Sequence, residues 1–102
     1  MVVTGSEGAF ITQAEAVTMT TAFRTKFQKE VKAHMVGKDK LMEILAQEGC
    51  EGIRVYNSVN VKGELDVILV GVDSNNKDML NLILDRTSPC PNYCDTTSAL
   101  CQ

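Results

Sequence analysis

The sequence predicts an α+β fold: two N-terminal amphipathic helices packed on an antiparallel β-hairpin, then a short third helix and a C-terminal tail that contains cysteines. Three observations support this prediction. Apolar residues recur at three- and four-residue steps between residues 12 and 48. They alternate with polar residues from residue 53 onward. Three of the four cysteines lie at or beyond residue 90.

The 102 residues are expected to form a single domain, residues 1–102. Residues 1–9 contain two glycines and no clear periodicity, so we expect a lead segment or an edge strand there. Residues 87–102 are expected to form the cysteine-bearing tail.

The first predicted helix begins after Thr12 and runs to about residue 36. Thr12 and Glu15 fit the capping box, in which the two side chains satisfy free backbone N–H groups at the helix start. Gly37 is expected to end the helix in a left-handed conformation. One stripe of the helix is expected to face the core, and it consists of Ala16, Met19, Phe23, Phe27 and Val31.

A second helix is expected over residues 40–48, with Asp39 as its N-cap and Gly49 just beyond its last turn. Its apolar residues would give it one buried side. Because few residues separate the two helices, we expect them to form a tight helical corner.

A β-hairpin is expected after the second helix. Residues 53–61 alternate as a half-buried strand does, and Lys62-Gly63 is expected to form the tight turn. The return strand, residues 64–73, contains a continuous apolar run that is typical of a central strand covered on both faces. The hairpin therefore lacks a neighbour, which must come from the N-terminal residues, the tail or another subunit.

Asp78 is expected to cap the short third helix, which runs to about residue 85. Pro89 and Pro91 exclude regular helix from residues 88–94.

Charge is distributed unevenly along the chain, whose net charge is −3. Residues 24–40 hold six basic and two acidic residues, and the remainder holds four basic and eleven acidic ones. This asymmetry favours association of a basic face with an acidic one, in a homo-oligomer. The candidate partner-binding residues on the basic face of the first helix are Arg24, Lys26, Lys29 and Lys32. We do not expect nucleic-acid binding, because no aromatic residues interleave with these charges.

The cysteines, Cys50, Cys90, Cys94 and Cys101, admit three interpretations. They can stay reduced thiols, form one or two disulfides that tie the tail to the body, or bind zinc as four thiolates. The spacing of Cys90 and Cys94 has one residue more than the usual two-residue zinc knuckle. We therefore expect no bound metal or other cofactor, with the four cysteines as the candidate ligands if a metal is bound.

The residues do not predict an enzyme. His34 is the single histidine, and we place it near the end of the first helix, where hydrogen bonding or interaction with the helix dipole is the usual role. No phosphate-binding glycine loop, nucleophile elbow or catalytic carboxylate pair is present, and no small-molecule substrate can be named.

No apolar run reaches the roughly 18–20 residues of a membrane helix. The first residues also lack the basic and apolar regions of a signal peptide. From these absences we expect a cytoplasmic protein.

Four segments carry a resemblance to a known group of proteins. They are Val31-Lys-Ala-His-Met-Val-Gly-Lys, Ile44-Leu-Ala-Gln-Glu-Gly-Cys-Glu-Gly-Ile-Arg-Val-Tyr, Leu69-Val-Gly-Val-Asp and Pro89-Cys-Pro-Asn-Tyr-Cys. In their order they resemble a family of small uncharacterised Bacteroidetes proteins with a C-terminal Cys-Pro-x-x-Cys segment. The resemblance covers residues 12–94 and implies a stand-alone bacterial domain, but it implies no activity and no site.

Together these observations predict a non-enzymatic structural or interaction protein that self-associates through the unfinished sheet edge and opposed charge faces. Two alternatives stay open. One is a small metal-binding or thiol-redox-responsive module that uses the C-terminal cysteines, with Cys50 or His34 as a further partner. The other is a binder of an anionic partner through the basic face of the first helix.

Overall fold

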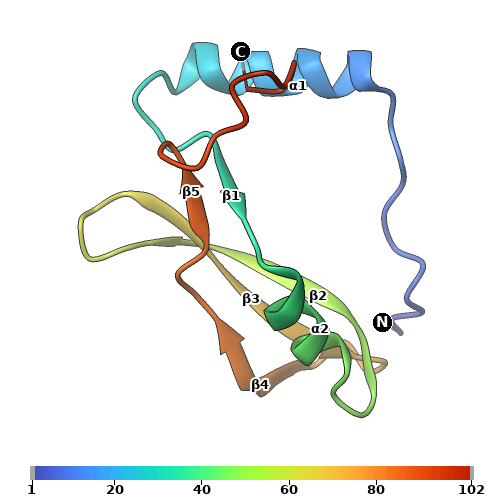
Figure 1. Ribbon diagram of the computed structural model, residues 1–102. Coiled ribbons are helices and arrows are strands. Elements are labelled where there is room, and N and C mark those ends of the chain that lie inside the picture. The colour runs from blue at the N-terminus through green and yellow to red at the C-terminus, as the bar shows by residue number, and fades with distance from the viewer. Residues whose placement is uncertain (1, 102) are drawn as a thin grey trace.

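The computed structural model describes residues 2–101 and confirms an α+β fold (Figure 1). Two helices and five strands follow one another along the chain. They are α1 (Gln13–Lys26), β1 (Ala33–Met35), α2 (Lys38–Leu45), β2 (Cys50–Val59), β3 (Leu65–Asp73), β4 (Asp78–Leu84) and β5 (Ser88–Cys90).

The predicted hairpin is present and forms part of a three-stranded antiparallel sheet in the order β2-β3-β4. β2 and β3 pair without interruption from Ile53, opposite Gly71, to Val59, opposite Leu65. The turn lies where it was expected, because Asn60 and Glu64 are joined by a backbone hydrogen bond of 2.9 Å and Gly63 has a φ of 81°. A side chain disfavours this left-handed conformation, which explains a glycine there.

The predicted third helix over residues 78–85 is wrong, because this segment forms β4 and pairs with β3. β4 thereby supplies the neighbour that β3 was expected to need, so the expectation that this neighbour comes from the N-terminal residues, the tail or another subunit is wrong. The pairing is irregular: Val70 lies opposite Ile83, whereas the next residue, Gly71, lies opposite Met79. Residues 80–82 therefore bulge out of the ladder.

The first helix starts as expected but ends ten residues early. The Glu15 backbone N–H donates to the Thr12 hydroxyl oxygen at 3.1 Å, as the capping box requires. The Glu15 carboxylate reaches the Thr12 hydroxyl at 3.1 Å. α1 then ends at Lys26.

The end of α1 is set by a strand pair that the sequence did not reveal. β1 pairs antiparallel with β5 in a second, two-stranded sheet, and the Lys32 N–H donates to the Cys90 carbonyl at 2.8 Å. A helix that continued to residue 36 would lose these bonds. Gly37 is consequently not a left-handed C-cap: it is the N-cap residue of α2, with an extended backbone at φ −66° and ψ 143°.

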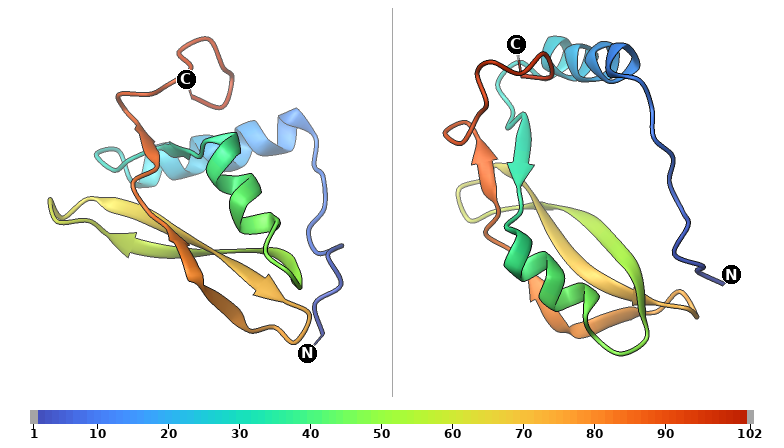
Figure 2. Two further views of the ribbon diagram at one scale, coloured as in Figure 1. Left: turned by 60° about the horizontal axis from the view of Figure 1, so that its bottom comes forward. Right: turned by 45° about the vertical axis from the view of Figure 1, so that its right-hand side comes forward.

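α2 lies close to its predicted range, and Asp39 is in its first turn instead of at the N-cap. It is the helix that packs on the sheet, where it contacts β2 and β3 (Figure 2). Within residues 2–101 the buried apolar residues are few, and they are Ile44, Leu69, Val70, Val72 and Cys90.

The prediction that both helices pack on the hairpin is wrong for α1, which contains no buried residue. α1 lies apart from the three-stranded sheet, with the C-terminal tail beside it (Figures 1 and 2). The radius of gyration is 15.1 Å, above the about 13 Å typical of a compact domain of this length.

Residues 2–12 form no helix or strand, and the Val3 N–H donates to the Ser74 carbonyl. Neither helix of the described chain is long and apolar enough to cross a membrane.

Candidate functional site

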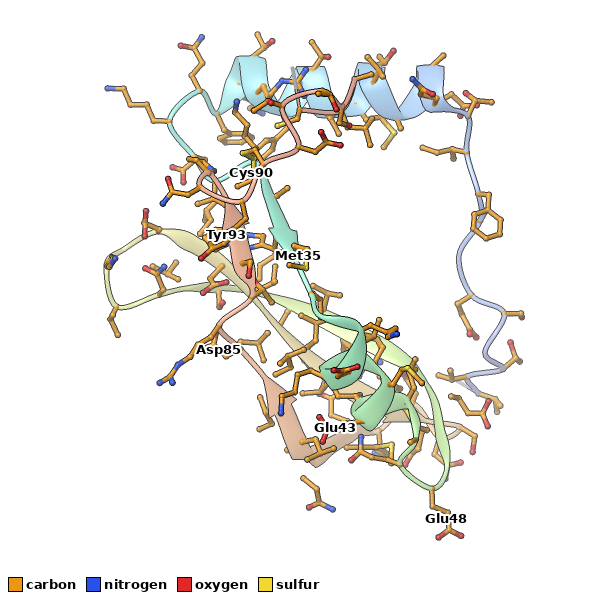
Figure 3. All side chains as sticks on the ribbon, in the orientation of Figure 1. Met35, Glu43, Glu48, Asp85, Cys90 and Tyr93 are labelled. Carbon is orange, nitrogen blue, oxygen red and sulfur yellow. A yellow bond between two sulfur atoms is a disulfide. The ribbon has the colours of Figure 1, made fainter. Side chains whose placement is uncertain are left out.

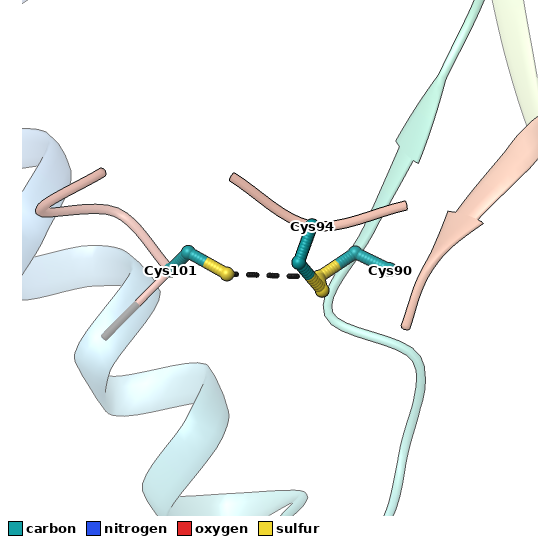
Figure 4. Close-up of side chains that lie close together, drawn as sticks. All are labelled: Cys90, Cys94 and Cys101. Carbon is teal, nitrogen blue, oxygen red and sulfur yellow. Dashed lines mark hydrogen bonds between the residues drawn. A yellow bond between two sulfur atoms is a disulfide. The ribbon is translucent and has the colours of Figure 1, made fainter. Parts of the chain in front are cut away.

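Three of the four cysteines meet where the tail returns to β5. Cys90 and Cys94 form a disulfide, and Sγ of Cys101 lies 3.6 Å from Sγ of Cys90 (Figure 4). Cys90 is 3% exposed, whereas Cys94 and Cys101 are half-buried. The arrangement therefore places a free thiol in contact with a disulfide.

Local and long-range contacts build this cluster. Pairing with β1 fixes Cys90 opposite Ala33, and Figure 3 shows Cys90 at the end of β5 that faces α1. The Tyr93 N–H donates to the Pro89 carbonyl at 2.9 Å, which turns the chain so that Cys94 comes back to Cys90. Arg24 of α1 donates to the Leu100 carbonyl, and this bond holds the residue next to Cys101.

Cys50 is not part of the cluster. It begins β2, its Sγ donates to the Gly52 carbonyl at 3.3 Å, and it packs against Gly71. The four cysteines therefore do not converge into one tetrahedral set.

As a metal site, the cluster offers at most three ligands among the described residues. The sulfur atoms of Cys90, Cys94 and Cys101 lie within 4.8 Å of one another, and His34 is not in this group. In the disulfide state only Cys101 keeps a thiol, so a metal would require reduction of the disulfide first.

His34 lies on β1 instead of near the end of a long helix. Its Nδ1 is 3.2 Å from the Thr87 hydroxyl and 3.6 Å from an Asp66 carboxylate oxygen. Nucleophilic catalysis by a triad needs one partner on each ring nitrogen. Because both partners here approach Nδ1, the group does not have that geometry, although it borders a cavity of about 480 Å³.

A polar cluster on the sheet was missed at the sequence level. The Arg54 guanidinium donates to the carboxylate of Asp78 and to the side-chain oxygen of Asn76, and the Tyr56 hydroxyl donates to Asp78. Hydrogen bonds from Tyr56 and Arg54 lower the pKa of Asp78, and the same contacts raise the pKa of Tyr56 and of Arg54. The only sequence signal was an arginine and a tyrosine two apart on one strand face.

The basic residues proposed as a partner surface do not share one helix face. Arg24 and Lys26 belong to α1, whereas Lys29 and Lys32 lie beyond its end. Arg24 is bonded to the tail, and the Lys26 ammonium lies 5.6 Å from the centre of the Phe27 ring. Among the four candidate basic residues, Lys29 and Lys32 are the two whose side chains form no hydrogen bond, ion pair or cation–π contact within residues 2–101.

The outer edge of β2 is the regular open edge of the three-stranded sheet. From Ile53 to Val59 its pairing with β3 is unbroken, and no strand of the described chain pairs with its other side. Apolar side chains along it are exposed, and Val55 is 55% exposed. Open, flat and apolar strand edges are templates for pairing with another chain.

Comparison with protein-family models, with curated proteins and with solved structures finds no match to this chain. The resemblance to a family of Bacteroidetes proteins therefore stays a prediction. Function has to be inferred from the geometry of the cysteine cluster, the polar cluster on the sheet and the open edge of β2.

Proposed function

We propose that the protein is a non-enzymatic subunit of a homo-oligomer, in which the sheet continues into a second copy across the outer edge of β2. The observation that carries this proposal is the stretch Ile53–Val59, which pairs with β3 without interruption on one side, has no strand of residues 2–101 on its other side, and exposes apolar side chains. Backbone groups along such an edge gain hydrogen bonds when a second strand is added.

The two edges of the sheet differ in a way that favours β2 over β4. Bulges blunt an edge because they twist it and interrupt its hydrogen-bonding groups. β4 bulges at residues 80–82, whereas β2 is regular over seven residues. The single charged residue in that stretch, Arg54, is already bonded to Asp78 and Asn76.

The distribution of apolar side chains also supports association. Among residues 2–101, five apolar residues are buried, whereas 18 large apolar or aromatic side chains are exposed. Scattered exposed side chains are normal, but so large an excess over the core favours burial in an assembly.

Antiparallel pairing of two β2 strands brings no like charges together. In the register centred on Tyr56, Ile53 lies opposite Val59 of the second copy and Arg54 lies opposite Ser58. A two-fold interface of this kind uses the same surface on both subunits. The basic block of residues 24–40 and the acidic remainder add an attraction between copies that weakens with salt.

The test compares two lysine substitutions at similarly exposed edge positions, Val55→Lys on β2 and Leu80→Lys on the β4 bulge. Val55 is 55% and Leu80 63% exposed, so neither change disturbs the core. Light scattering over a concentration series is expected to show a dimer for the natural chain and for Leu80→Lys. Val55→Lys is expected to raise the dimer Kd by about tenfold or more, which corresponds to about 1.4 kcal/mol.

A natural chain that stays monomeric at the highest concentration contradicts the proposal. A dimer that Val55→Lys leaves intact, but that Leu80→Lys disrupts, moves the interface to β4 and contradicts the assignment to β2.

A further inference from the structure

We propose that Cys90, Cys94 and Cys101 form a thiol–disulfide exchange site, at which the thiolate of Cys101 attacks Sγ of Cys90 and transfers the disulfide from the 90–94 loop to the tail. This inference concerns residues 90–101, which are separate from the β2 edge, and it does not depend on self-association. The chemical class of the reactant is a cysteine thiol, which the chain itself supplies.

The thiol and the disulfide are already in contact, and all three sulfur atoms lie within 4.8 Å of one another, so Sγ of Cys101 lies beside the Cys90–Cys94 bond and turns into line with it to attack. Sγ of Cys101 is 3.6 Å from Sγ of Cys90, and Figure 4 shows the Cys101 side chain directed toward the disulfide. Holding two reacting groups at such a distance replaces a bimolecular encounter with a step inside one molecule. The hydrogen bond from Arg24 to the Leu100 carbonyl maintains this distance, because it fixes the residue that precedes Cys101.

The step balances without an external oxidant or reductant. The Cys101 thiol first loses its proton to solvent, and its thiolate attacks Cys90. The bond between the sulfur atoms of Cys101 and Cys90 forms while the Cys90–Cys94 bond breaks, and Cys94 leaves as a thiolate that takes up a proton. One disulfide and one thiol are present before and after the step.

Burial selects Cys90 as the attacked sulfur and Cys94 as the leaving group. Cys90 is 3% exposed, so a thiolate there would be poorly hydrated. Cys94 is half-buried and follows the exposed Tyr93. The negative charge of the leaving thiolate therefore forms on Cys94, which is closer to water than Cys90.

The exchange changes what the disulfide connects. Before the step the disulfide joins two residues that lie four positions apart in the sequence. Afterwards it joins β5 to residue 101, and through the Arg24–Leu100 bond it fastens the tail and α1 to the β1–β5 sheet. The link between the end of the tail and the β1–β5 sheet then becomes covalent, while the Arg24–Leu100 hydrogen bond joins α1 to that tail.

The experiment follows which cysteine carries the free thiol. A Cys50→Ala chain is scrambled in denaturant, transferred to native buffer at pH 8 and pulsed with N-ethylmaleimide at intervals. Tandem mass spectrometry of residues 87–102, cut further after Tyr93 and Leu100, assigns the label to Cys90, Cys94 or Cys101. The natural chain is measured in parallel, because the label on Cys50 falls in a separate tryptic peptide, residues 41–54.

We expect the Cys90 label to disappear and the remaining label to be shared between Cys94 and Cys101. The relaxation is expected to be about tenfold or more faster in native buffer than in denaturant at the same pH, and slower in Arg24→Ala. Its rate should rise with pH, because only the thiolate is nucleophilic.

Three results overturn the proposal: a label confined to Cys101 after relaxation, a label confined to Cys94, or scrambled pairings that persist unchanged in native buffer. Cys101→Ser in the Cys50→Ala chain is the control, because it leaves no thiol to label when the Cys90–Cys94 disulfide is formed.

Discussion

At the scale of single residues, Asp78 is the centre of the polar cluster on the sheet. It is the first residue of β4, and its two carboxylate oxygens accept hydrogen bonds from Arg54 and Tyr56 of β2. These bonds reach across β3 and connect the two outer strands of the sheet. The same contacts keep Arg54 away from the open edge on which we expect a second copy to dock.

The Asp78 contacts predict a specific pH dependence of stability. Hydrogen bonds from Tyr56 and Arg54 lower the pKa of Asp78 below its ordinary value of 3.8. A carboxyl group whose pKa is lowered on folding stabilises the fold above the ordinary pKa, and loses that contribution as the pH falls through the folded value. Asp78→Asn is therefore expected to lower the Tm at pH 7.

The difference in Tm between the natural chain and Asp78→Asn is expected to shrink as the pH falls below 3.8. Thermal unfolding followed by circular dichroism measures it, with Asp85→Asn, an exposed carboxylate just beyond β4, as the control. A difference that is the same at pH 3 and pH 7 would show that the charge of Asp78 has no part in stability.

At the scale of elements, the contact between α2 and β3 is the packing on which the core depends. Ile44 of α2 is 2% exposed and lies against Gly71 of β3. A Cβ on Gly71 would lie 3.0 Å from both Cys50 Sγ and Gln47 Nε2, and 3.3 Å from Ile44 Cγ2. Only a residue without a side chain allows the helix to approach this closely.

Gly71→Ala is accordingly expected to lower the free energy of unfolding by about 1–3 kcal/mol, because it overpacks the contact between helix and strand. Gly52→Ala is the matched control, since it also lies in a strand and its Cβ would meet nothing within 4 Å. Urea unfolding of both variants measures the difference. Equal stabilities for the two variants would mean that α2 can shift to make room.

The elements also show which parts of the fold are readable from sequence. The start of α1 and the β2–β3 hairpin were predicted correctly, because Thr12 with Glu15 and Lys62 with Gly63 act within a few residues. The end of α1 was not, because β1 pairs with residues more than 50 positions away. The helical pattern beyond Lys26 gives way to that pairing.

β4 was mistaken for a helix for a related reason. Residues 79–84 are Met, Leu, Asn and Ile residues in a short apolar run, which does not distinguish a helix from a buried strand. Because β3 needs a second neighbouring strand, this segment forms a strand instead of a helix. The segment next in sequence meets that need, because residues 78–84 pair with β3.

The candidate site was predicted only in part. The clustering of cysteines in the tail was visible, and a disulfide was one of the interpretations left open, but the Cys90–Cys94 bond lies within residues 87–102 and does not tie the tail to the body as expected. The contact of Cys101 with Cys90, and the separation of Cys50, were not visible, because they depend on the Arg24–Leu100 bond and on the position of α2 against β3.

At the scale of the whole molecule, the chain has a small core and a large apolar surface. α1 and the tail lie apart from the three-stranded sheet (Figure 1), and α1 has no buried residue. The sheet keeps a regular open edge at β2. These features agree with a subunit that completes its structure by pairing with another copy.

The most direct test of that pairing is hydrogen–deuterium exchange of the natural chain at a low and a high protein concentration. Peptides that cover β2 are expected to take up deuterium more slowly at the high concentration, because the outer backbone N–H groups of the strand become hydrogen-bonded to a second copy. Peptides that cover the β4 bulge are expected to exchange equally at both concentrations. Uptake by β2 that does not depend on concentration, or protection that appears at β4 instead, would contradict the account.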